Sequence, residues 1–523
     1  MKDIHWADKI AEKLIKEHEK KKFVCAAGIT PSGKVHIGNF RDVITSDLVC
    51  RALKDKGCQA ELIFFWDDFD KLRKIPKGIP IEFEKYLGMP LTEIPDPYEC
   101  HESYAKHFES EFEEVLPFLG IRPKIIYQAE MYKKNKYYKE IKKALQEREK
   151  IAKIFGKFKT QGISKEEKKR FFPLNVYCRK CRKSSTKIIN YEDDNIEYIC
   201  LCNYKETANI KKENIGKLSW KVDWAMRWYY YSVDFEPGGS DHATPGGSFD
   251  VAKEIVTKIF KAKPPLFIGY AFVGIKGATK MSSSKGIGIA PKELLNIYEP
   301  ELLRWIFCKT LPQRPITFFF DSHIIKQYDE FDREIENLHR NKLSEIKKRQ
   351  LEFSSIIHGK IPEERNANFR QVASFGQVVQ GNLEELKKIF ERLGQKYKEK
   401  YLKIRFEKSQ NWIKNFMPEL AIRVRETPNY SYYEKLKKEE KEQLKRFVDE
   451  MEKYWSLEKL TWFIYEIPKK SEMTEEEKKK AQRNFFKIIY NMLIDKDTGP
   501  RLPTLLMALG KEKVKKLLTI ENQ

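Results

Sequence analysis

Two short polar motifs, far apart in the chain, hold the residue types that a nucleotide site needs. The first runs from Thr30 to Asn39 and follows an apolar run at 23–27. Its glycines allow a tight turn and a close approach of phosphate, while His36 offers a donor at the start of a helix. The second, Lys280 to Gly286, sets two lysines around three serines, which suits a mobile cationic loop over a departing pyrophosphate. Either motif alone is typical of an ordinary surface turn, but together they predict one nucleotide site.

Chemistry at the α-phosphate of ATP spreads negative charge, and it needs positioned donors and cations rather than a covalent enzyme intermediate. We therefore expect catalytic roles for His36 and Asn39 in the first motif, and for Lys280 and Lys285 in the second. The expected ATP contacts extend over both motifs. They are Thr30, Pro31, Ser32, Gly33, His36, Gly38, Asn39, Lys280, Met281, Ser282, Ser283, Ser284 and Lys285.

A parallel sheet is the element that can bring these motifs together. The pattern predicts a buried strand at 23–29, a helix at 36–56 and a second strand at 60–66, which makes a right-handed crossover. Nucleotides bind at the carboxyl edge of such α/β sheets. A further apolar run at 266–273 leads toward the second motif, so both motifs can converge in one fold. The charged segment between them is interpreted as an insertion that splits this fold.

Bulk composition limits the classes of protein that fit. A chain of 523 residues predicts three or four domains, and its net charge of +23 fits a polyanionic partner as well as it fits a generally lysine-rich composition. No run of about 18 apolar residues occurs, so no membrane span is expected. Residues 1–22 have the pattern of an amphipathic helix and not of a signal peptide. With no export signal, these features favour the cytosol.

Four cysteines are bunched in the segment between the motifs, on two short knuckles. Four thiolates are the set that a structural zinc needs for tetrahedral closure, and residues 188–198 between the knuckles are typical of a hairpin. The second pair has one residue fewer between its cysteines than the usual spacing. The expected zinc ligands are Cys178, Cys181, Cys200 and Cys202.

A second cluster of metal-ligating types precedes the cysteine knuckles. A helix over 98–114 would place His107 about two turns from Cys100, with Asp96 reaching in from the preceding loop. The same residue types are also common where a helix begins, so the pattern alone leaves both readings open. The candidate ligands are Asp96, Cys100, His101 and His107. Neither cluster is expected to be catalytic, because four protein ligands leave no open position for water.

Several further segments support a resemblance to a known family. The paired motifs resemble the HIGH and KMSKS signatures of class I aminoacyl-tRNA synthetases, and the tryptophan-rich stretch 220–228, the triplet Ser240-Asp241-His242 and the closing stretch 498–510 resemble the class I lysyl type of archaea and some bacteria. Asn39 stands where the class has a second histidine. A serine takes the place of the usual second lysine, with Lys285 displaced to follow. Both departures are similar to the lysyl type.

The resemblance implies a reaction and its partners. Lysine would be activated with ATP and Mg²⁺ to lysyl-adenylate and then transferred to the 3′-terminal adenosine of lysine tRNA, with two structural zinc ions per chain; no membrane or obligatory protein partner is implied. It also implies lysine contacts from Gly28, Thr30, Trp220, His242 and Tyr270. A buried lysine ammonium needs a counter-charge, for which the residue types offer two candidates. These are Asp223 and Asp241.

The resemblance also implies an α/β fold class, with a Rossmann-type parallel sheet split by a zinc-bearing insertion and followed by an all-α anticodon-binding domain. The expected boundaries are 1–95 for the first half of the catalytic domain, 96–215 for the insertion that binds the acceptor end, 216–290 for the second half, 291–330 for a connecting helical region and 331–523 for the anticodon-binding domain.

Three other functions remain compatible with parts of the pattern. A class I synthetase for glutamate or another amino acid would share both motifs, but glutamate would require a cationic pocket where the sequence offers acids and aromatics. A nucleotidylyltransferase of small metabolism can carry a similar histidine motif, but it would leave the helical C-terminal region without a purpose. A non-catalytic tRNA-binding relative would account for the charge and the cysteines only.

Overall fold

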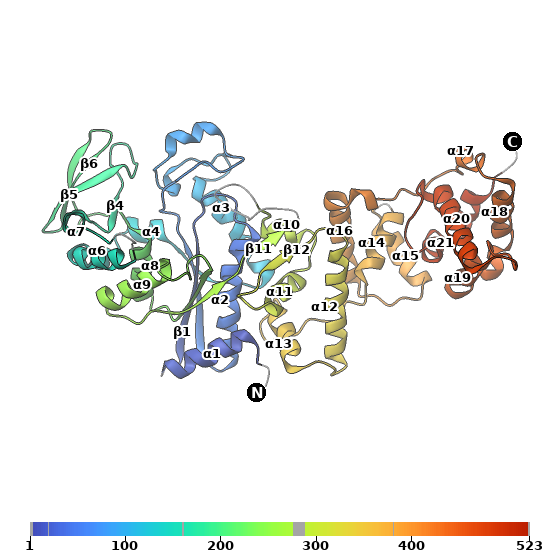
Figure 1. Cartoon of the computed structure of the whole chain (residues 1–523), viewed down its shortest axis with the longest axis horizontal. Helices are drawn as coiled ribbons and strands as arrows, with labels where there is room; N and C mark the ends of the chain where they lie inside the picture. The colour runs from blue at the N-terminus through green and yellow to red at the C-terminus, as the bar shows by residue number, and fades with distance from the viewer. Residues whose placement is uncertain (1–3, 19, 159–161, 276–287, 380, 521–523) are drawn as a thin grey trace. The chain divides into compact units, whose positions relative to one another are not determined.

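The computed structural model describes residues 4–18, 20–158, 162–275, 288–379 and 381–520 (Figure 1). The chain divides into two compact units. Unit 1 comprises Met1–Leu295, Pro300–Phe318 and Asn337–Pro362, and unit 2 comprises Asn296–Glu299, Phe319–Glu336 and Glu363–Gln523. The second motif, Lys280 to Gly286, lies outside the described residues, so its expected contacts are not placed.

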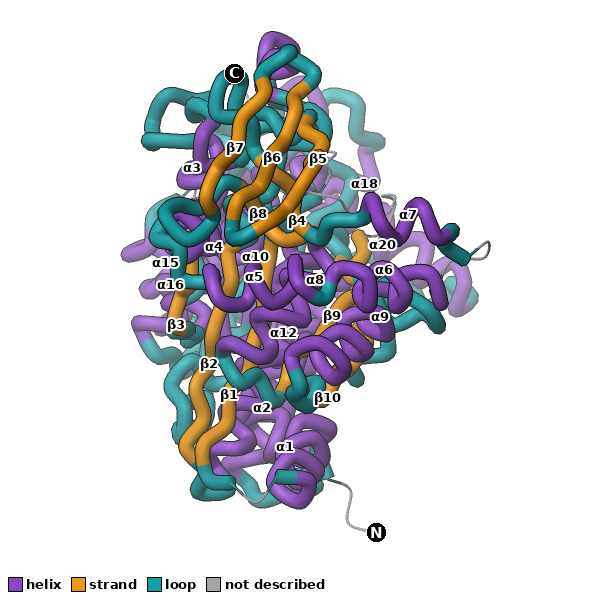
Figure 2. The backbone as a smooth tube through the Cα atoms, turned by 90° about the vertical axis from the view of Figure 1, so that its left-hand side faces the viewer, coloured by secondary structure: helices purple, strands orange, loops and turns teal. Residues whose placement is uncertain are grey.

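Unit 1 is built on a five-stranded parallel sheet with the strand order β10-β9-β1-β2-β3, and Figure 2 shows the five strands side by side. The chain moves from β1 outward to β2 and β3, then returns to add β9 and β10 on the other side of β1. The strands span Lys22–Ile29 (β1), Gln59–Trp66 (β2), Lys124–Tyr127 (β3), Phe235–Gly239 (β9) and Leu266–Tyr270 (β10).

The crossover from β1 to β2 follows the sequence pattern closely. Helix α2 (Ile37–Asp55) is capped at its start by His36, and its apolar residues pack on the sheet. It stops at Gly57, whose φ of +79° is a left-handed conformation that glycine adopts at little cost. The predicted strand, helix and second strand are therefore confirmed, each within one residue of its expected bounds. Helix α1 (Trp6–Glu17) buries Leu14 and confirms the amphipathic start of the chain.

Sequence analysis missed two strands of this sheet, β9 and the short strand β3. Strand β3 lies within 96–215, which was interpreted wholly as an insertion, yet it pairs in parallel with β2 from Ile63 with Lys124 to Trp66 with Tyr127. A strand of four residues is too short to show the alternating pattern by which a strand is recognised in a sequence. Around it the chain forms α3 (Tyr104–Glu113), the short 3₁₀ turns Ile81–Tyr86, Leu91–Glu93 and Pro117–Leu119, and helices α4 (Gln128–Lys133), α5 (Tyr138–Gln146), α6 (Arg148–Lys157) and α7 (Lys165–Arg170).

The cysteine-bearing segment forms small antiparallel sheets. Strand β4 (Leu174–Val176) pairs with β8 (Gly216–Leu218), and β5 (Thr186–Glu192), β6 (Asn195–Cys200) and β7 (Lys205–Asn209) form a three-stranded sheet. The hairpin predicted over 188–198 is confirmed, with Asp193 and Asp194 at positive φ in its two-residue turn. The rest of unit 1 comprises α8 (Trp220–Tyr230), α9 (Ser248–Ile255), the π-helical turn Val256–Phe260, β11 (Val273–Ile275), α10 (Pro291–Leu295), α11 (Pro300–Lys309), β12 (Ile316–Phe318) and α13 (Glu345–Ser354).

Unit 2 is built, in the described residues, from helices joined by loops, as the sequence pattern predicts. Most of α12 (His323–His339) belongs to this unit, and a large apolar cluster centred on residues such as Phe447, Leu493 and Leu506 forms its core. None of the described helices is long and apolar enough to cross a membrane. The other helices of unit 2 are α14 (Phe369–Val378), α15 (Leu383–Arg392), α16 (Glu399–Phe416), α17 (Tyr430–Tyr433), α18 (Lys438–Glu450), α19 (Leu457–Glu466), α20 (Glu475–Ile494), α21 (Leu502–Leu509) and α22 (Lys511–Leu518), with 3₁₀ turns at Pro418–Leu420 and Met451–Tyr454.

Candidate active site at the carboxyl edge of the sheet

A cavity of about 470 Å³ opens in unit 1 at the carboxyl ends of β1, β9 and β10. Strands β1 and β9 are neighbours in the sheet, but the chain leaves them on opposite sides, so the cavity lies where the strand order reverses. Open α/β sheets bind ligands at this position because the connecting loops diverge there and leave a crevice. Thr30 follows β1, Gly239 ends β9 and Tyr270 ends β10, and all three line the cavity.

The first motif presents His36 at this cavity with a defined tautomer. The His36 Nδ1 atom accepts a hydrogen bond from the Asn39 backbone N–H at 3.3 Å, and the Asn39 Oδ1 atom accepts one from the His36 backbone N–H at 3.3 Å. Because Nδ1 is an acceptor, a neutral ring carries its proton on Nε2. Burial lowers the pKa of His36 to about 4, so the ring is neutral at pH 7. His36 is thus a neutral N–H donor beside the positive end of the α2 dipole, an arrangement suited to a phosphate.

The backbone that follows the second motif is attached to the same helix end. The Ile37 backbone N–H donates to the Ile289 carbonyl oxygen at 2.8 Å. A Cβ atom at Gly288 would come within 2.7 Å of the His36 Cβ atom, so this position tolerates no side chain without a shift. The segment beyond the second motif therefore lies directly against the first motif.

Two buried carboxyl groups lie near one another in the cavity. Burial raises the pKa of Asp42 to about 8, and the charge of Glu236 adds to this effect, while hydrogen bonds from the Gly28 backbone N–H, at 2.9 Å, and the Tyr270 hydroxyl oppose it. Burial likewise raises the pKa of Glu236. Each carboxyl group is costly to ionise by itself, so both favour the arrival of a cation.

A row of tryptophans on α8 holds Glu236 in place. Trp220, Trp224 and Trp228 recur every four residues and so share one face of the helix, with neighbouring ring centroids 5.1 and 4.8 Å apart. The indole N–H groups of Trp224 and Trp228 donate to the two Glu236 carboxylate oxygens at 3.0 and 2.6 Å. His242 packs beside the row, 6.3 Å from Trp220 between ring centroids. The cavity thus combines aromatic walls with a fixed carboxylate.

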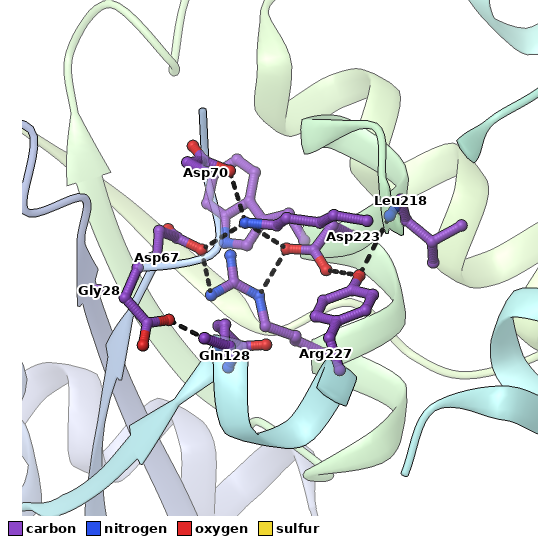
Figure 3. A network of polar contacts seen from close by, with 12 residues as sticks. Gly28, Asp67, Asp70, Gln128, Leu218, Asp223 and Arg227 are labelled. Atoms are coloured by element: carbon purple, nitrogen blue, oxygen red, sulfur yellow. Dashed lines mark hydrogen bonds and ion pairs between the residues drawn. The ribbon is translucent and has the colours of Figure 1, made fainter. Parts of the chain in front are cut away.

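A buried ionic network braces the side of the cavity that faces α8 (Figure 3). The Lys217 Nζ atom lies 3.1 Å from Asp67 and 2.6 Å from Asp70, and the Arg227 guanidinium contacts Asp67 at 3.1 Å and Asp223 at 3.3 Å. Asp223 also accepts a hydrogen bond from the Tyr132 hydroxyl. Three carboxylates thus share two cations at the wall of the cavity.

The structure brings most of the predicted site residues together. Those that line the cavity are Gly28, Thr30, Ser32, His36, Gly38, Asn39, Trp220, Asp241, His242 and Tyr270. Pro31 and Gly33 are buried in the turn before α2 and do not line it, and Asp223 is held behind the wall by the ionic network. The expected contacts Lys280, Met281, Ser282, Ser283, Ser284 and Lys285 lie outside the described residues.

Sequence reasoning missed Asp42, Asp67, Asp70, Glu236 and Arg227, which also line the cavity. Two of them, Asp42 and Glu236, could have been recognised from the sequence. Asp42 follows Gly38 by four residues and therefore lies on the same face of α2. Glu236 is a charged residue inside a short run that otherwise has the composition of a buried strand, directly before Pro237.

The four cysteines predicted to bind zinc converge. Their sulfur atoms all lie within 4.8 Å of one another, with Cys178 and Cys202 3.7 Å apart and Cys181 and Cys200 3.5 Å apart. Tetrahedral zinc with Zn–S bonds of about 2.3 Å separates its sulfurs by about 3.8 Å, so the set fits this metal. The residue that follows each cysteine pair adopts a left-handed conformation, with a φ of +60° at Arg182 and +61° at Asn203. The second pair therefore closes a tight turn like the first, although it is one residue shorter.

The second predicted cluster also converges, although its expected helix is wrong over the first turns. Helix α3 starts at Tyr104, so Cys100 and His101 belong to the preceding loop and only His107 lies on the helix. The Cys100 Sγ atom is 3.1 Å from His101 Nδ1, 3.3 Å from His107 Nδ1 and 3.3 Å from Asp96 Oδ2. Three backbone N–H groups also donate to Asp96 and hold its carboxylate in this position. The donor set and its spacing fit one tetrahedral zinc.

Known proteins resemble this chain over its whole length. Among solved structures, a glutamate tRNA ligase from Elizabethkingia meningosepticum matches with a TM-score of 0.44 and 13% identity over 95% of this chain and 98% of that chain, a likeness too low to carry weight. A lysine–tRNA ligase from Borrelia garinii is 35% identical over 99% of both chains, and one from Pyrococcus horikoshii is 35% identical over 99% of this chain and 100% of the relative. The family described as tRNA synthetases class I (K) matches residues 4–358. The chain therefore belongs to the class I (K) family of tRNA synthetases.

Proposed function

We propose that this protein is a lysine–tRNA ligase, which activates lysine with ATP to lysyl-adenylate and pyrophosphate and then esterifies the 3′-terminal adenosine of lysine tRNA. The observation that carries the choice of amino acid is the charge of the cavity. Among the described residues that line it, five carboxyl groups stand against two guanidinium groups. Lysine brings two ammonium groups and one carboxylate, whereas glutamate brings the reverse, so the acid excess favours lysine.

The two buried carboxyl groups supply the counter-charges in this proposal. Asp42 and Glu236 are shielded from water and close enough to repel each other. The two ammonium groups of lysine would offset both the cost of burying the carboxylates and the repulsion between them. Trp220, Tyr270 and His242 form the walls for the aliphatic stem, and Gly28 and Thr30 offer backbone and hydroxyl contacts at the end of β1. The Asp241 carboxylate, which is exposed at the rim, is the weaker candidate for a counter-charge. Asp223 contributes indirectly, by orienting Arg227.

ATP in this proposal lies across the start of α2. The His36 Nε2–H group and the helix N-terminus donate to the phosphates and stabilise the charge that develops as the α-phosphate is attacked. Asn39 fixes the His36 ring, because its backbone N–H occupies Nδ1. Bound Mg²⁺ would neutralise phosphate charge, and Lys280 and Lys285 would stabilise the departing pyrophosphate. The remaining first-motif residues shape the turn that admits the nucleotide.

Two structural zinc ions per chain complete the proposal. Cys178, Cys181, Cys200 and Cys202 would hold one, and Asp96, Cys100, His101 and His107 the other, each with all four positions filled by protein. The first would stabilise the small cysteine-bearing sheets, and the second would fix the loop before α3. The cysteine-bearing region is proposed to contact the acceptor end of the tRNA, and the helical C-terminal region its anticodon.

The test is amino-acid-dependent exchange of labelled pyrophosphate into ATP. Lysine is expected to support exchange and glutamate to give only background, with charging of lysine tRNA in a second assay. Exchange with glutamate and none with lysine would overturn the amino-acid choice. Absence of exchange with every amino acid, in protein that still binds tRNA, would overturn the enzymatic proposal itself.

A further inference from the structure

A second cavity of unit 1, of about 480 Å³, lies beside the loop that follows β2. None of the residues that line it lines the first cavity. Oxygen-bearing side chains reach it from four separate elements: Asp68 from the loop after β2, Thr92 from a 3₁₀ turn, Glu109 from α3 and Tyr127 from β3. The cavity is therefore built by the fold and does not depend on one flexible loop.

Glu109 is the group in this cavity that lacks a partner. Its side chain is only 2% exposed, and its Oε1 atom is shielded from solvent with no hydrogen-bond partner in the described parts of the chain. The Thr92 hydroxyl oxygen is likewise shielded from solvent and has no hydrogen-bond partner in the described parts of the chain. Asp68 is equally buried, close enough to Glu109 for their charges to repel, and it accepts one hydrogen bond, from the Ala129 backbone N–H at 2.7 Å. Buried carboxylates are normally paired with a cation or bound to a metal.

The nearby lysines are engaged with other groups. The Lys106 Nζ atom lies over the Tyr127 ring, 4.9 Å from its centroid, and 3.5 Å from the Tyr127 hydroxyl. Lys133 forms its ion pair with Glu93 at 3.5 Å. In the described structure neither lysine forms an ion pair with Asp68 or Glu109. The charges of Lys106 and Lys217 act on Glu109 and Asp68 without an ion pair in the described structure, and burial still raises the pKa of Glu109 to about 8 and that of Asp68 to about 7. A further cation in the cavity would therefore favour ionisation of both carboxyl groups in place of their protons.

We propose that this cavity binds a hydrated divalent cation of the magnesium class, held by the carboxylates of Asp68 and Glu109 with the Thr92 hydroxyl. The donors are all oxygen atoms, which suits a hard cation and disfavours zinc or copper. Calcium usually takes six to eight oxygen ligands, whereas magnesium keeps several of its waters and needs only one or two carboxylates. A cavity of this size has room for those waters, each of which takes about 30 Å³.

An ion bound at Asp68 would also affect the structure of the first cavity. Asp67 and Asp68 are consecutive, and Asp67 lines the first cavity and binds Lys217 and Arg227 there, whereas Asp68 lines the second. An ion at Asp68 fixes the turn that follows β2 and thereby the network that braces the first cavity. This site is separate from the magnesium that accompanies ATP, and the proposal does not depend on the identity of the amino acid.

Manganese is the probe, because its free and bound forms are distinguished by electron paramagnetic resonance. Full-length protein loaded with zinc and free of nucleotide is titrated with Mn²⁺, and one saturable site per chain is expected, with Mg²⁺ competing. Glu109→Gln is isosteric and removes a buried charge, so it is expected to fold and to weaken Mn²⁺ binding at least tenfold. Asp68→Asn provides a second variant with the same expectation. The matched control is Glu114→Gln, which removes an exposed carboxylate at the end of α3 and should leave binding unchanged.

Thermal unfolding supplies an independent readout. A cation that binds only the folded chain raises the melting temperature, so Mg²⁺ should stabilise the wild type and Glu114→Gln but not Glu109→Gln. Three results would each overturn the proposal. They are no stoichiometric Mn²⁺ site in the wild type, unchanged Mn²⁺ affinity in both Glu109→Gln and Asp68→Asn, or displacement of the bound Mn²⁺ by spermidine but not by Mg²⁺.

Discussion

With Asp42 as the proposed partner of a lysine ammonium group, its raised pKa predicts that lysine binding depends on pH in a definite direction. In the empty site burial keeps this carboxyl group protonated below about pH 8. The lysine ammonium is best matched by the ionised carboxylate, so binding favours loss of the proton. Lysine affinity is therefore expected to rise with pH up to about 8 and to level off above it. Glu236, whose pKa burial also raises, contributes in the same direction.

The size of the effect follows from the pKa. A group with a pKa of about 8 is about one tenth ionised at pH 7 and half ionised at pH 8, so the KM for lysine should fall about fivefold over that unit. The KM for ATP provides the internal control, because the proposal gives Asp42 no role in phosphate binding. Asp42→Asn removes the titrating group and keeps the shape. It should raise the KM for lysine at pH 8 about tenfold and flatten its dependence on pH.

Pyrophosphate exchange at a series of lysine concentrations between pH 6.5 and 8.5 measures this dependence. Calorimetry in two buffers with different heats of ionisation then counts the proton released on binding at pH 7. The reasoning would be refuted by a KM for lysine that does not change with pH in the wild type. Retention of the full pH dependence in Asp42→Asn would refute the assignment to this residue.

Three further predictions concern the carboxyl groups Glu236 and Asp223, the His36 ring and the two metal clusters. Glu236→Gln should raise the KM for lysine at least tenfold, and Asp223→Asn should change it less than twofold; equal effects in exchange kinetics would contradict the indirect role of Asp223. His36→Ala should lower the rate of adenylate formation at least about a hundredfold while tRNA binding measured by filter retention survives, since its Nε2–H acts on developing charge; a loss of tRNA binding would assign it to docking. Elemental analysis should return about two zinc ions per chain and about one in Cys181→Ser, and a wild type with one zinc would discard the Asp96 cluster.

The crossover that carries the first motif could be predicted because its signals are local. The apolar run at 23–29, the helical period after His36 and Gly57 at the helix end act within a few residues of one another, and the structure keeps all of them. The convergence of the four cysteines could be predicted for a similar reason, since the metal chemistry restricts which side chains can be bunched in this way.

The buried acids of the cavity could not be predicted, because their role depends on long-range pairing. Glu236 meets Asp42 only because β9 adds to the sheet beside β1, with Phe235 opposite Cys25 and some two hundred residues of chain between them. The position of Asp223 behind the cavity wall could not be predicted either, because the spacing does not show which way its side chain turns. Asp223 follows Trp220 by three residues on α8, but it turns to Arg227 and Tyr132 and away from the aromatic row. Neither outcome can be deduced from the residue spacing alone.

The hydrogen bond from Ile37 to Ile289 has a consequence for how such a chain can change over time. It joins backbone to backbone, so almost any side-chain substitution leaves it intact, and only proline at 37 removes the donor. Gly288 is different, because any larger residue there must displace His36. The two segments at the proposed ATP site are thus coupled through their backbones, so an altered backbone path on one side requires a matching change on the other.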